Sequence, residues 1–380
     1  MRGLLVPVLT AAFVLGLAPT SASDDVGEVA RAGQWQLGAM RLPEAWRSSK
    51  GEGVLVAVLD TGVNGDHPDL EGAVIQGPDL TGAARGPWGQ HGTAMASLIA
   101  GRGHGASRGV VGVAPQAKVL SVRVTLENGD PRREQRRSGG RDALARGIRY
   151  AADHGADVIS MSLGGGSGSW EGSASEEEAV QYAVGKGIVL VASSGNDGAA
   201  ANKKNFPAAY PGVIAVGAVD QRLQVAGFSN RQDYLSVVAP GTEIVTADGG
   251  DSYVVGDGTS SAAAMVAGVA ALIKSAHPGM SPAHVRMAIE LGTRHRPSDG
   301  YSSSYGHGVA NALLALRAAA RMDVPTASAL ARPGPYVGGS RPMPVPAPAS
   351  RTPVVAGLLL LMAGMSARVL IMYRRRGDST

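Results

Sequence analysis

The sequence predicts an α/β protein, with a largely parallel sheet that carries helices on both faces and with one C-terminal transmembrane helix. First, apolar runs of strand length, rich in β-branched residues, alternate with helical patterns through the middle of the chain. Parallel strands need such crossover segments to bring the chain back to the same edge of the sheet. Second, 44% hydrophobic residues and 54 glycines among 380 residues are typical of a loop-rich globular protein. Third, a long apolar segment lies close to the C-terminus.

Five strands and four helices follow from these patterns. The expected strands span 54–59, 119–124, 158–162, 188–192 and 213–219, and the expected helices span 91–101, 141–154, 175–185 and 260–273. Sheets of this kind place their sites at the carboxyl ends of the strands. Asp60, Ser162 and Asn196 all lie at or shortly after such an end, so they are the first candidates for functional residues.

Residues 1–22 have the pattern of a secretory signal peptide. Arg2 precedes an apolar run over 4–17, and residues 20–22 are the small residues that suit signal-peptidase cleavage. The alternative is a buried N-terminal helix. Residues 23–33 then form a short N-terminal extension, and residues 34–320 form the globular domain.

The C-terminal part predicts a membrane anchor. Residues 321–352 are a Pro-rich linker, and the 21 residues of 353–373 are enough to cross the ~30 Å hydrocarbon core at 1.5 Å per residue. Three arginines open the tail at 374–380, which the positive-inside rule places in the cytoplasm. The alternative for 353–373 is an amphipathic surface helix. The prediction is a single-pass protein of the cell membrane with its globular domain outside the cell.

The absence of cysteine excludes disulfides and thiolate chemistry. The formal net charge of +4 does not indicate a nucleic-acid partner, because the excess arginines lie in the C-terminal tail beside the apolar segment. No nucleic-acid binding is therefore expected.

Three short blocks stand in one order along the chain, and each holds one possible catalytic side chain: Asp60 in Asp-Thr-Gly, His91 in His-Gly-Thr and Ser260 in Gly-Thr-Ser. Acyl transfer by a serine requires an imidazole that removes its proton and a buried carboxylate that orients the imidazole. Asp60 ends a buried strand, and Ser260 begins a buried helix, whose positive end favours a developing oxyanion. Taken singly, Asp60 also fits a turn and Ser260 an ordinary helix N-cap.

Asn196 follows a strand, and its side-chain amide is suited to be the second donor of an oxyanion hole, beside the backbone N–H of Ser260. The sequence therefore predicts three catalytic residues, Asp60, His91 and Ser260, and an oxyanion hole formed by Asn196 and Ser260.

These blocks resemble the subtilase (subtilisin-like serine protease) family, over roughly 34–315. The likeness extends beyond the triad to the runs 56–63, 67–70, 112–115, 160–165, 210–218, 239–241 and 306–309. It implies a subtilisin-like fold and a serine endopeptidase that acts on peptide or protein substrates.

The resemblance also implies a substrate cleft. One wall of its S1 pocket would be Ser162, Leu163 and Gly164, which pair with the substrate backbone, and the other wall would be Ser193, Ser194 and Gly195. Asn205 precedes the Phe-Pro pair at the base of the pocket, where the family often has glycine. A side chain there would disfavour large aromatic P1 residues. Alternatively, Asn205 turns to solvent and leaves the pocket unchanged.

The signal peptide, linker and anchor resemble those of the mycosin branch, the membrane-anchored proteases associated with type VII secretion. This likeness implies components of a secretion machine as partners. It leaves two functions open: a membrane-anchored endopeptidase, or a scaffold subunit of a secretion complex with secondary protease activity.

The sequence departs from the family at several positions. Ala264 stands where the family usually has proline, and Ala94 where it has a second histidine. Asp69 matches a position that binds calcium in many subtilases. The partner loop over 103–108 has no carboxylate or asparagine, so calcium is not expected there. The chemistry itself requires no metal or other cofactor.

Overall fold

The structure is a computed structural model that describes residues 22–83, 89–105, 107–133, 142–164 and 172–322. The predicted transmembrane helix and cytoplasmic tail lie outside these residues, as do all of the signal peptide except Ala22 and nearly all of the linker.

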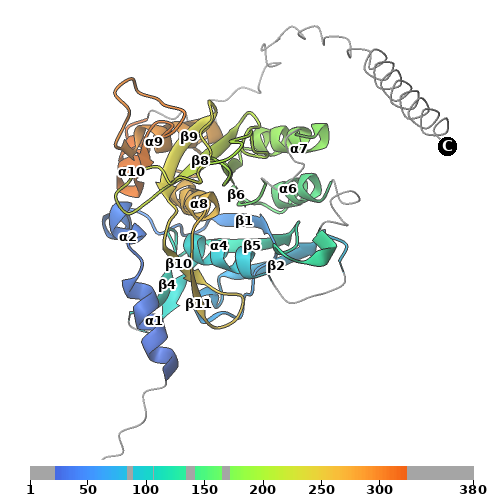
Figure 1. Cartoon of the computed structure of the whole chain (residues 1–380), viewed down its shortest axis with the longest axis vertical. Helices are drawn as coiled ribbons and strands as arrows, with labels where there is room; N and C mark the ends of the chain where they lie inside the picture. The colour runs from blue at the N-terminus through green and yellow to red at the C-terminus, as the bar shows by residue number, and fades with distance from the viewer. Residues whose placement is uncertain (1–21, 84–88, 106, 134–141, 165–171, 323–380) are drawn as a thin grey trace, which may run out of the picture. The chain divides into compact units, whose positions relative to one another are not determined.

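Within the described residues, a nine-stranded sheet forms the centre of the domain (Figure 1). Its strand order is β12-β13-β9-β8-β7-β6-β1-β5-β2, and every neighbouring pair is parallel except β12 and β13. The five predicted strands are confirmed, each to within one residue at either end. The strands are β1 (Leu55–Asp60), β2 (Val74–Asp79), β5 (Lys118–Arg123), β6 (Val158–Met161), β7 (Val189–Ser193), β8 (Val213–Val219), β9 (Leu235–Pro240), β12 (Thr293–Arg294) and β13 (Val309–Ala310).

Helices cover both faces of the sheet, as the fold class predicts. One face packs against α4 (Gln90–Ala100), α8 (Thr259–Ala276), α9 (Pro282–Leu291) and α10 (Ala312–Ala319), and the other against α6 (Ala143–Asp153) and α7 (Ala174–Gly185). Short helices α2 (Gln36–Ala39), α3 (Leu42–Ala45) and η1 (Pro68–Leu70) and two hairpins complete the domain. The hairpins are β3 (Arg102–His104) with β4 (Arg108–Val111), and β10 (Ile244–Ala247) with β11 (Tyr253–Gly256).

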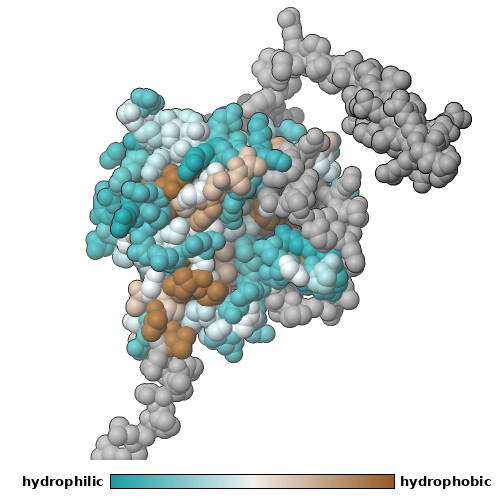
Figure 2. Space-filling view, viewed as in Figure 1, coloured by the Kyte–Doolittle hydropathy of each residue, from teal (hydrophilic) through white to brown (hydrophobic). Residues whose placement is uncertain are grey.

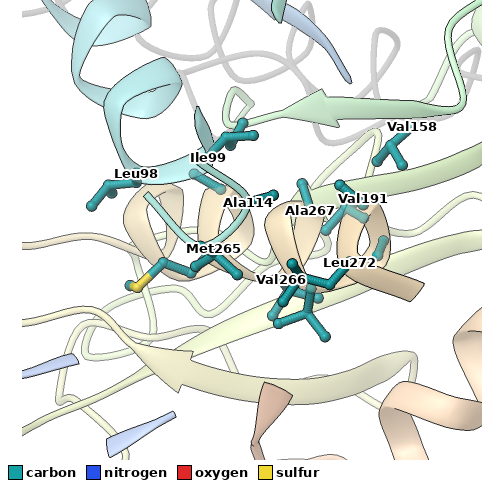
Figure 3. Close-up of a cluster of buried hydrophobic side chains, with 14 of the residues drawn as sticks. Leu98, Ile99, Ala114, Val158, Val191, Met265, Val266, Ala267 and Leu272 are labelled. Atoms are coloured by element: carbon teal, nitrogen blue, oxygen red, sulfur yellow. The ribbon is translucent and has the colours of Figure 1, made fainter. Parts of the chain in front are cut away.

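Alternation along the strands divides the core in two. In β1, Val56 and Val58 point into the core beneath α4 and α8, whereas Ala57 and Leu59 point into the core beneath α6 and α7. This period of two is the geometry of a strand that is buried on both faces. Figure 3 shows the larger core, in which side chains of α8 such as Val266 lie among those of α4 and the sheet.

Helix α8 is the one helix of the described residues whose length and hydropathy would suit a membrane span, and 83% of its apolar window is buried. It is therefore the central helix of the core, distinct from the segment 353–373 that the sequence predicts as an anchor. Small residues such as Ala263 and Gly268 allow its close packing, since a Cβ at Gly268 would lie 2.5 Å from the Val113 side chain.

The N-terminal extension, for which no helix is predicted above, is helical: it forms α1 (Ala22–Ala32). Ala30 of α1 packs with Val110 of β4 and Val245 of β10 in a small separate cluster. Val26 and Val29 of α1 are exposed, and Figure 2 shows apolar surface over α1 and the neighbouring β11 on an otherwise largely hydrophilic face.

Candidate active site

Asp60 and His91 meet at the carboxyl end of the sheet. Asp60 ends β1 and is 1% exposed, and His91 lies in the first turn of α4. The Oδ1 atom of Asp60 lies 2.8 Å from Nδ1 of His91 and also accepts a hydrogen bond from the backbone N–H of Thr61 at 2.7 Å. With Asp60 ionised, the proton of the neutral imidazole resides on Nδ1, which leaves Nε2 free to accept a proton.

The environment of His91 favours its protonated form. Burial lowers the pKa of His91, but the charge of Asp60, the hydrogen bond to it and the charge of Glu127 together raise it more. The charge of Arg133 opposes them, and the pKa lies above the ordinary histidine value. Because 32% of the side-chain surface is exposed, the imidazole remains accessible to a substrate.

Ser260 lies in the first turn of α8, which packs against α4. Two hydrogen bonds join it to the end of β6: the Ser162 hydroxyl donates to the Ser260 carbonyl oxygen at 2.9 Å, and the Ser260 hydroxyl donates to the Ser162 carbonyl oxygen at 3.4 Å. Within the described residues, no hydrogen bond joins the Ser260 hydroxyl to His91. Catalytic hydrogen bonds are often long in free enzymes and tighten when substrate binds.

Two donors converge on the space beside Gly258. A Cβ placed on this glycine would lie 3.6 Å from Nδ2 of Asn196 and 3.7 Å from the backbone nitrogen of Ser260. The side-chain amide and the backbone N–H thus face one small volume. An oxyanion in that volume would be stabilised by both donors.

Thr259 fixes the orientation of Asn196. Both the backbone N–H and the hydroxyl of Thr259 donate to Oδ1 of Asn196, at 2.9 and 2.8 Å. The Thr259 hydroxyl also accepts a hydrogen bond from the backbone N–H of Gly195 at 3.2 Å. These contacts engage the Oδ1 end of the amide, and Nδ2 faces the space beside Gly258. Sequence analysis missed this role, although Thr259 stands inside the Gly-Thr-Ser block.

The two predicted walls of the S1 pocket lie side by side. The Ser193 hydroxyl donates to the carbonyl oxygen of Leu163 at 3.4 Å, and Ser162, Ser193 and Ser194 are all buried. Gly164 and Gly195 both adopt positive φ, 118° and 108°. A Cβ at Gly195 would lie 2.5 Å from Nδ2 of Asn230, so this wall requires glycine for space as well as conformation.

Asn205 lies between the two walls and does not turn to solvent. It is 2% exposed, and its Nδ2 donates to the Ser193 carbonyl oxygen at 2.8 Å. A Cβ at Gly164 would lie 2.7 Å from its Oδ1 atom. Among the described residues this Oδ1 atom has no hydrogen-bond partner. The alternative of a solvent-facing Asn205 is therefore wrong.

Residues 51–308 match the subtilase family. The chain belongs to this family. It is 41% identical over 265 residues to the thermophilic serine proteinase of Bacillus sp. strain AK1. The matched region is 69% of this chain and 62% of the relative. It is 40% identical over 253 residues to thermitase of Thermoactinomyces vulgaris. The matched region is 66% of this chain and 85% of thermitase. The subtilase thus spans less than two thirds of the length of the first relative.

Solved structures similar to this subtilase include mycosins. The crystal structure of MycP1 from Mycobacterium smegmatis matches with a TM-score of 0.66 and 29% identity, over 87% of this chain and 91% of that one. A second MycP1 structure matches with a TM-score of 0.64 and 30% identity, over 79% and 90%, and its protein is described as an essential component of the type VII (ESX-1) secretion system. These neighbours support the mycosin-like branch of the subtilases.

The residues around Asp69 do not fit a calcium ion. Asp69 is fully buried, and its Oδ1 atom lies 2.7 Å from Nδ1 of His104, while Oδ2 accepts the Val110 N–H at 2.6 Å. Arg31 of α1 lies beside this carboxylate and donates to the Gly109 carbonyl oxygen at 2.7 Å. Calcium needs six to eight oxygen ligands. In the described part of this subtilase, no cluster of three or more acidic, His or Cys residues could hold a metal ion.

Proposed function

We propose that this subtilase is a secreted, membrane-anchored serine endopeptidase that hydrolyses peptide bonds through an acyl-enzyme. The observation that carries the proposal is the 2.8 Å contact of Asp60 with His91 in the first turn of α4, which packs against the buried helix α8 with a serine at its N-terminus. Its substrates are peptides or proteins, and no nucleic acid takes part.

In the proposed mechanism Ser260 attacks the substrate carbonyl carbon while Nε2 of His91 takes the serine proton. Asp60 holds the imidazole by its Nδ1–H and stabilises the imidazolium. The carbonyl oxygen becomes an oxyanion, which accepts hydrogen bonds from Asn196 Nδ2 and the Ser260 N–H. His91 then donates its proton to the leaving amine. A water molecule attacks the acyl-enzyme by the same steps and releases the acid.

The test uses active-site labelling and turnover. We expect Ser260→Ala to abolish labelling by a fluorophosphonate probe, and Ser260→Ala, His91→Ala and Asp60→Ala each to abolish peptide hydrolysis while the far-UV circular dichroism is unchanged. Double variants should lose little more than single ones, because the three residues act as a unit. Equal labelling of Ser260→Ala and wild type would refute the assignment.

The membrane anchor rests on the apolar run 353–373 and the arginines that follow it. Protease added to intact cells should digest the catalytic domain but leave an epitope at the C-terminus protected. Removal of 353–380 should release active, soluble enzyme into the medium. If the truncated protein remained in the membrane fraction, the anchor would lie elsewhere in the chain.

A second candidate function is that of a scaffold subunit in a type VII-like secretion complex. It is favoured by the similarity to MycP1, which is described as an essential component of such a system. A strain carrying Ser260→Ala separates the two functions when it is compared with a full deletion. If secretion fails only in the deletion strain, the scaffold role is independent of proteolysis. If it fails in both strains, proteolysis itself is required.

A further inference from the structure

Helix α4, which presents His91, begins without a capping side chain of its own. Its N-cap residue is Gly89, which has no side chain to accept the first N–H groups of the helix. A larger residue does not fit there, because a Cβ on Gly89 would lie 1.9 Å from Oγ1 of Thr61 and 2.6 Å from the Thr61 carbonyl oxygen. The close contact of α4 with the end of β1 therefore excludes the usual Ser, Thr, Asp or Asn cap.

The acceptors come instead from other elements. The Gly92 N–H donates to Oγ1 of Thr61 at 3.0 Å. The His91 N–H donates to Oε1 of Glu127 at 2.9 Å. Glu127 follows β5, the strand beside β1 in the sheet, and it is 36 residues from His91 in the sequence. A carboxylate at the N-terminus of a helix is also favoured by the positive end of the helix dipole.

We propose that Glu127 is a positioning residue for the general base: its carboxylate holds the backbone of His91 in the first turn of α4 and places a second negative charge beside the imidazole. The inference rests on the proposed function, in which His91 is the general base. Asp60 holds the ring of His91 through Nδ1, and Glu127 holds the backbone that carries the ring. The two carboxylates together restrict both the ring and the backbone of His91.

The charged groups that face His91 in the described residues agree with this role. They are Asp60 at the end of β1, and Glu127 and Arg133 in the segment after β5. The two carboxylates raise the pKa of His91, and Arg133 lowers it. Removal of the Glu127 charge should therefore lower the pKa of His91, independently of any change in its position.

Two variants separate position from charge. Glu127→Gln keeps an acceptor oxygen and removes the charge, whereas Glu127→Ala removes both. For Glu127→Ala we expect kcat to fall about tenfold with little change in KM, within the roughly hundredfold that a 1 Å misplacement can cost. Glu127→Gln should recover much of that loss in kcat. The acid limb of the pH profile of kcat/KM should move to lower pH in both variants.

Glu177→Gln is the matched control, because it removes the same charge from the first turn of α7, on the other face of the sheet. It should leave kcat and the pH profile as in wild type. A second readout is independent of turnover: an NMR titration of His91 in the Ser260→Ala background, with and without Glu127→Gln. The added substitution should lower the titration midpoint.

The outcomes distinguish this inference from the proposed function. If wild type hydrolyses no peptide and takes no fluorophosphonate label, the proposed function fails, whatever Glu127 does. If wild type is active but Glu127→Ala changes only the thermal midpoint, with kcat, the pH profile and the His91 titration all unchanged, Glu127 is an ordinary helix cap and the inference is wrong.

Discussion

No side chain fits between Gly92 and the carbonyl oxygen of Gly62, because a Cβ on Gly92 would lie 2.2 Å from that oxygen. The first turn of α4 thus rests directly on the turn that follows β1. Asp60 lies two residues before Gly62, and His91 lies directly before Gly92. Contact between two backbones therefore sets the distance between the carboxylate and the imidazole, which is 2.8 Å.

The first prediction concerns Gly92→Ala. The added methyl group forces α4 away from the turn after β1 and lengthens the contact of Asp60 with His91. We expect kcat to fall about a hundredfold, the scale that a 1 Å misplacement can reach. The control is Gly185→Ala at the end of α7, where a Cβ meets no atom within 4 Å; kcat should not change there. Wild-type kcat in Gly92→Ala would show that the backbone contact does not set the catalytic distance.

The second prediction concerns pH. Since the pKa of His91 is raised, kcat/KM should fall on acidification through a pKa above the ordinary value of 6.5. The protonated His91 paired with Asp60 also stabilises the fold. That contribution is complete below the unfolded-state pKa and is lost as the pH rises through the folded-state pKa. Asp60→Asn should move the acid limb to lower pH and reduce kcat by about 10⁴, as the corresponding change does in the serine protease triad.

Stopped-flow or steady-state assays from pH 5 to 10, with thermal melts at each pH, measure both effects. An acid limb at the same pH in wild type and Asp60→Asn would mean that another group controls it.

The third prediction concerns Thr259, whose hydroxyl holds Oδ1 of Asn196. Thr259→Val has the same shape and loses the hydroxyl, so the amide keeps only the backbone hydrogen bond at 2.9 Å. We expect a loss in kcat of about tenfold, smaller than the 10²–10³ expected for Asn196→Ala. In the double variant the second substitution should add little, since both act on one donor. Full additivity of the two effects would indicate that Thr259 acts by another route.

The fourth prediction concerns P1 specificity. Asn205 is buried between the two walls of the pocket, so wild type should prefer small P1 residues such as Ala to Phe. Asn205→Gly should raise kcat/KM for Phe relative to Ala by a factor that corresponds to about 1–3 kcal/mol. A peptide library that differs only at P1 gives the measurement. A wild-type preference for Phe or Leu that persists unchanged in Asn205→Gly would contradict the prediction.

The fifth prediction concerns the carboxylate of Asp69, whose partners are His104 and Arg31 rather than a metal ligand set. A chelator should therefore leave the thermal midpoint unchanged at neutral pH. His104→Ala should destabilise the fold by about 1–3 kcal/mol, because it removes a partner from a fully buried carboxylate. A fall of the midpoint with EDTA, restored by calcium, would show that an ion binds after all.

The fold class, the five central strands and the candidate site residues could be predicted from the sequence alone. Each of these depends on local information: β-branched runs define the strands, and short blocks of small residues surround Asp60, His91 and Ser260. The carboxyl ends of parallel strands form one edge. The positions of Asp60, Ser162 and Asn196 after predicted strands therefore suffice to expect all three at the same edge of the sheet.

Features that depend on contacts between distant segments could not be predicted in this way. The amide of Asn205 could face solvent or the pocket, and only the approach of the Ser193 carbonyl oxygen selects the pocket. Glu127 reaches the His91 N–H because β5 pairs with β1 and because α4 rests too closely on Thr61 for a cap of its own. The packing of α1 on β4, through Ala30 and Val110, is likewise a contact between distant segments. Hydrogen bonds and close contacts between distant segments leave no periodicity in the sequence, and so it could not predict them.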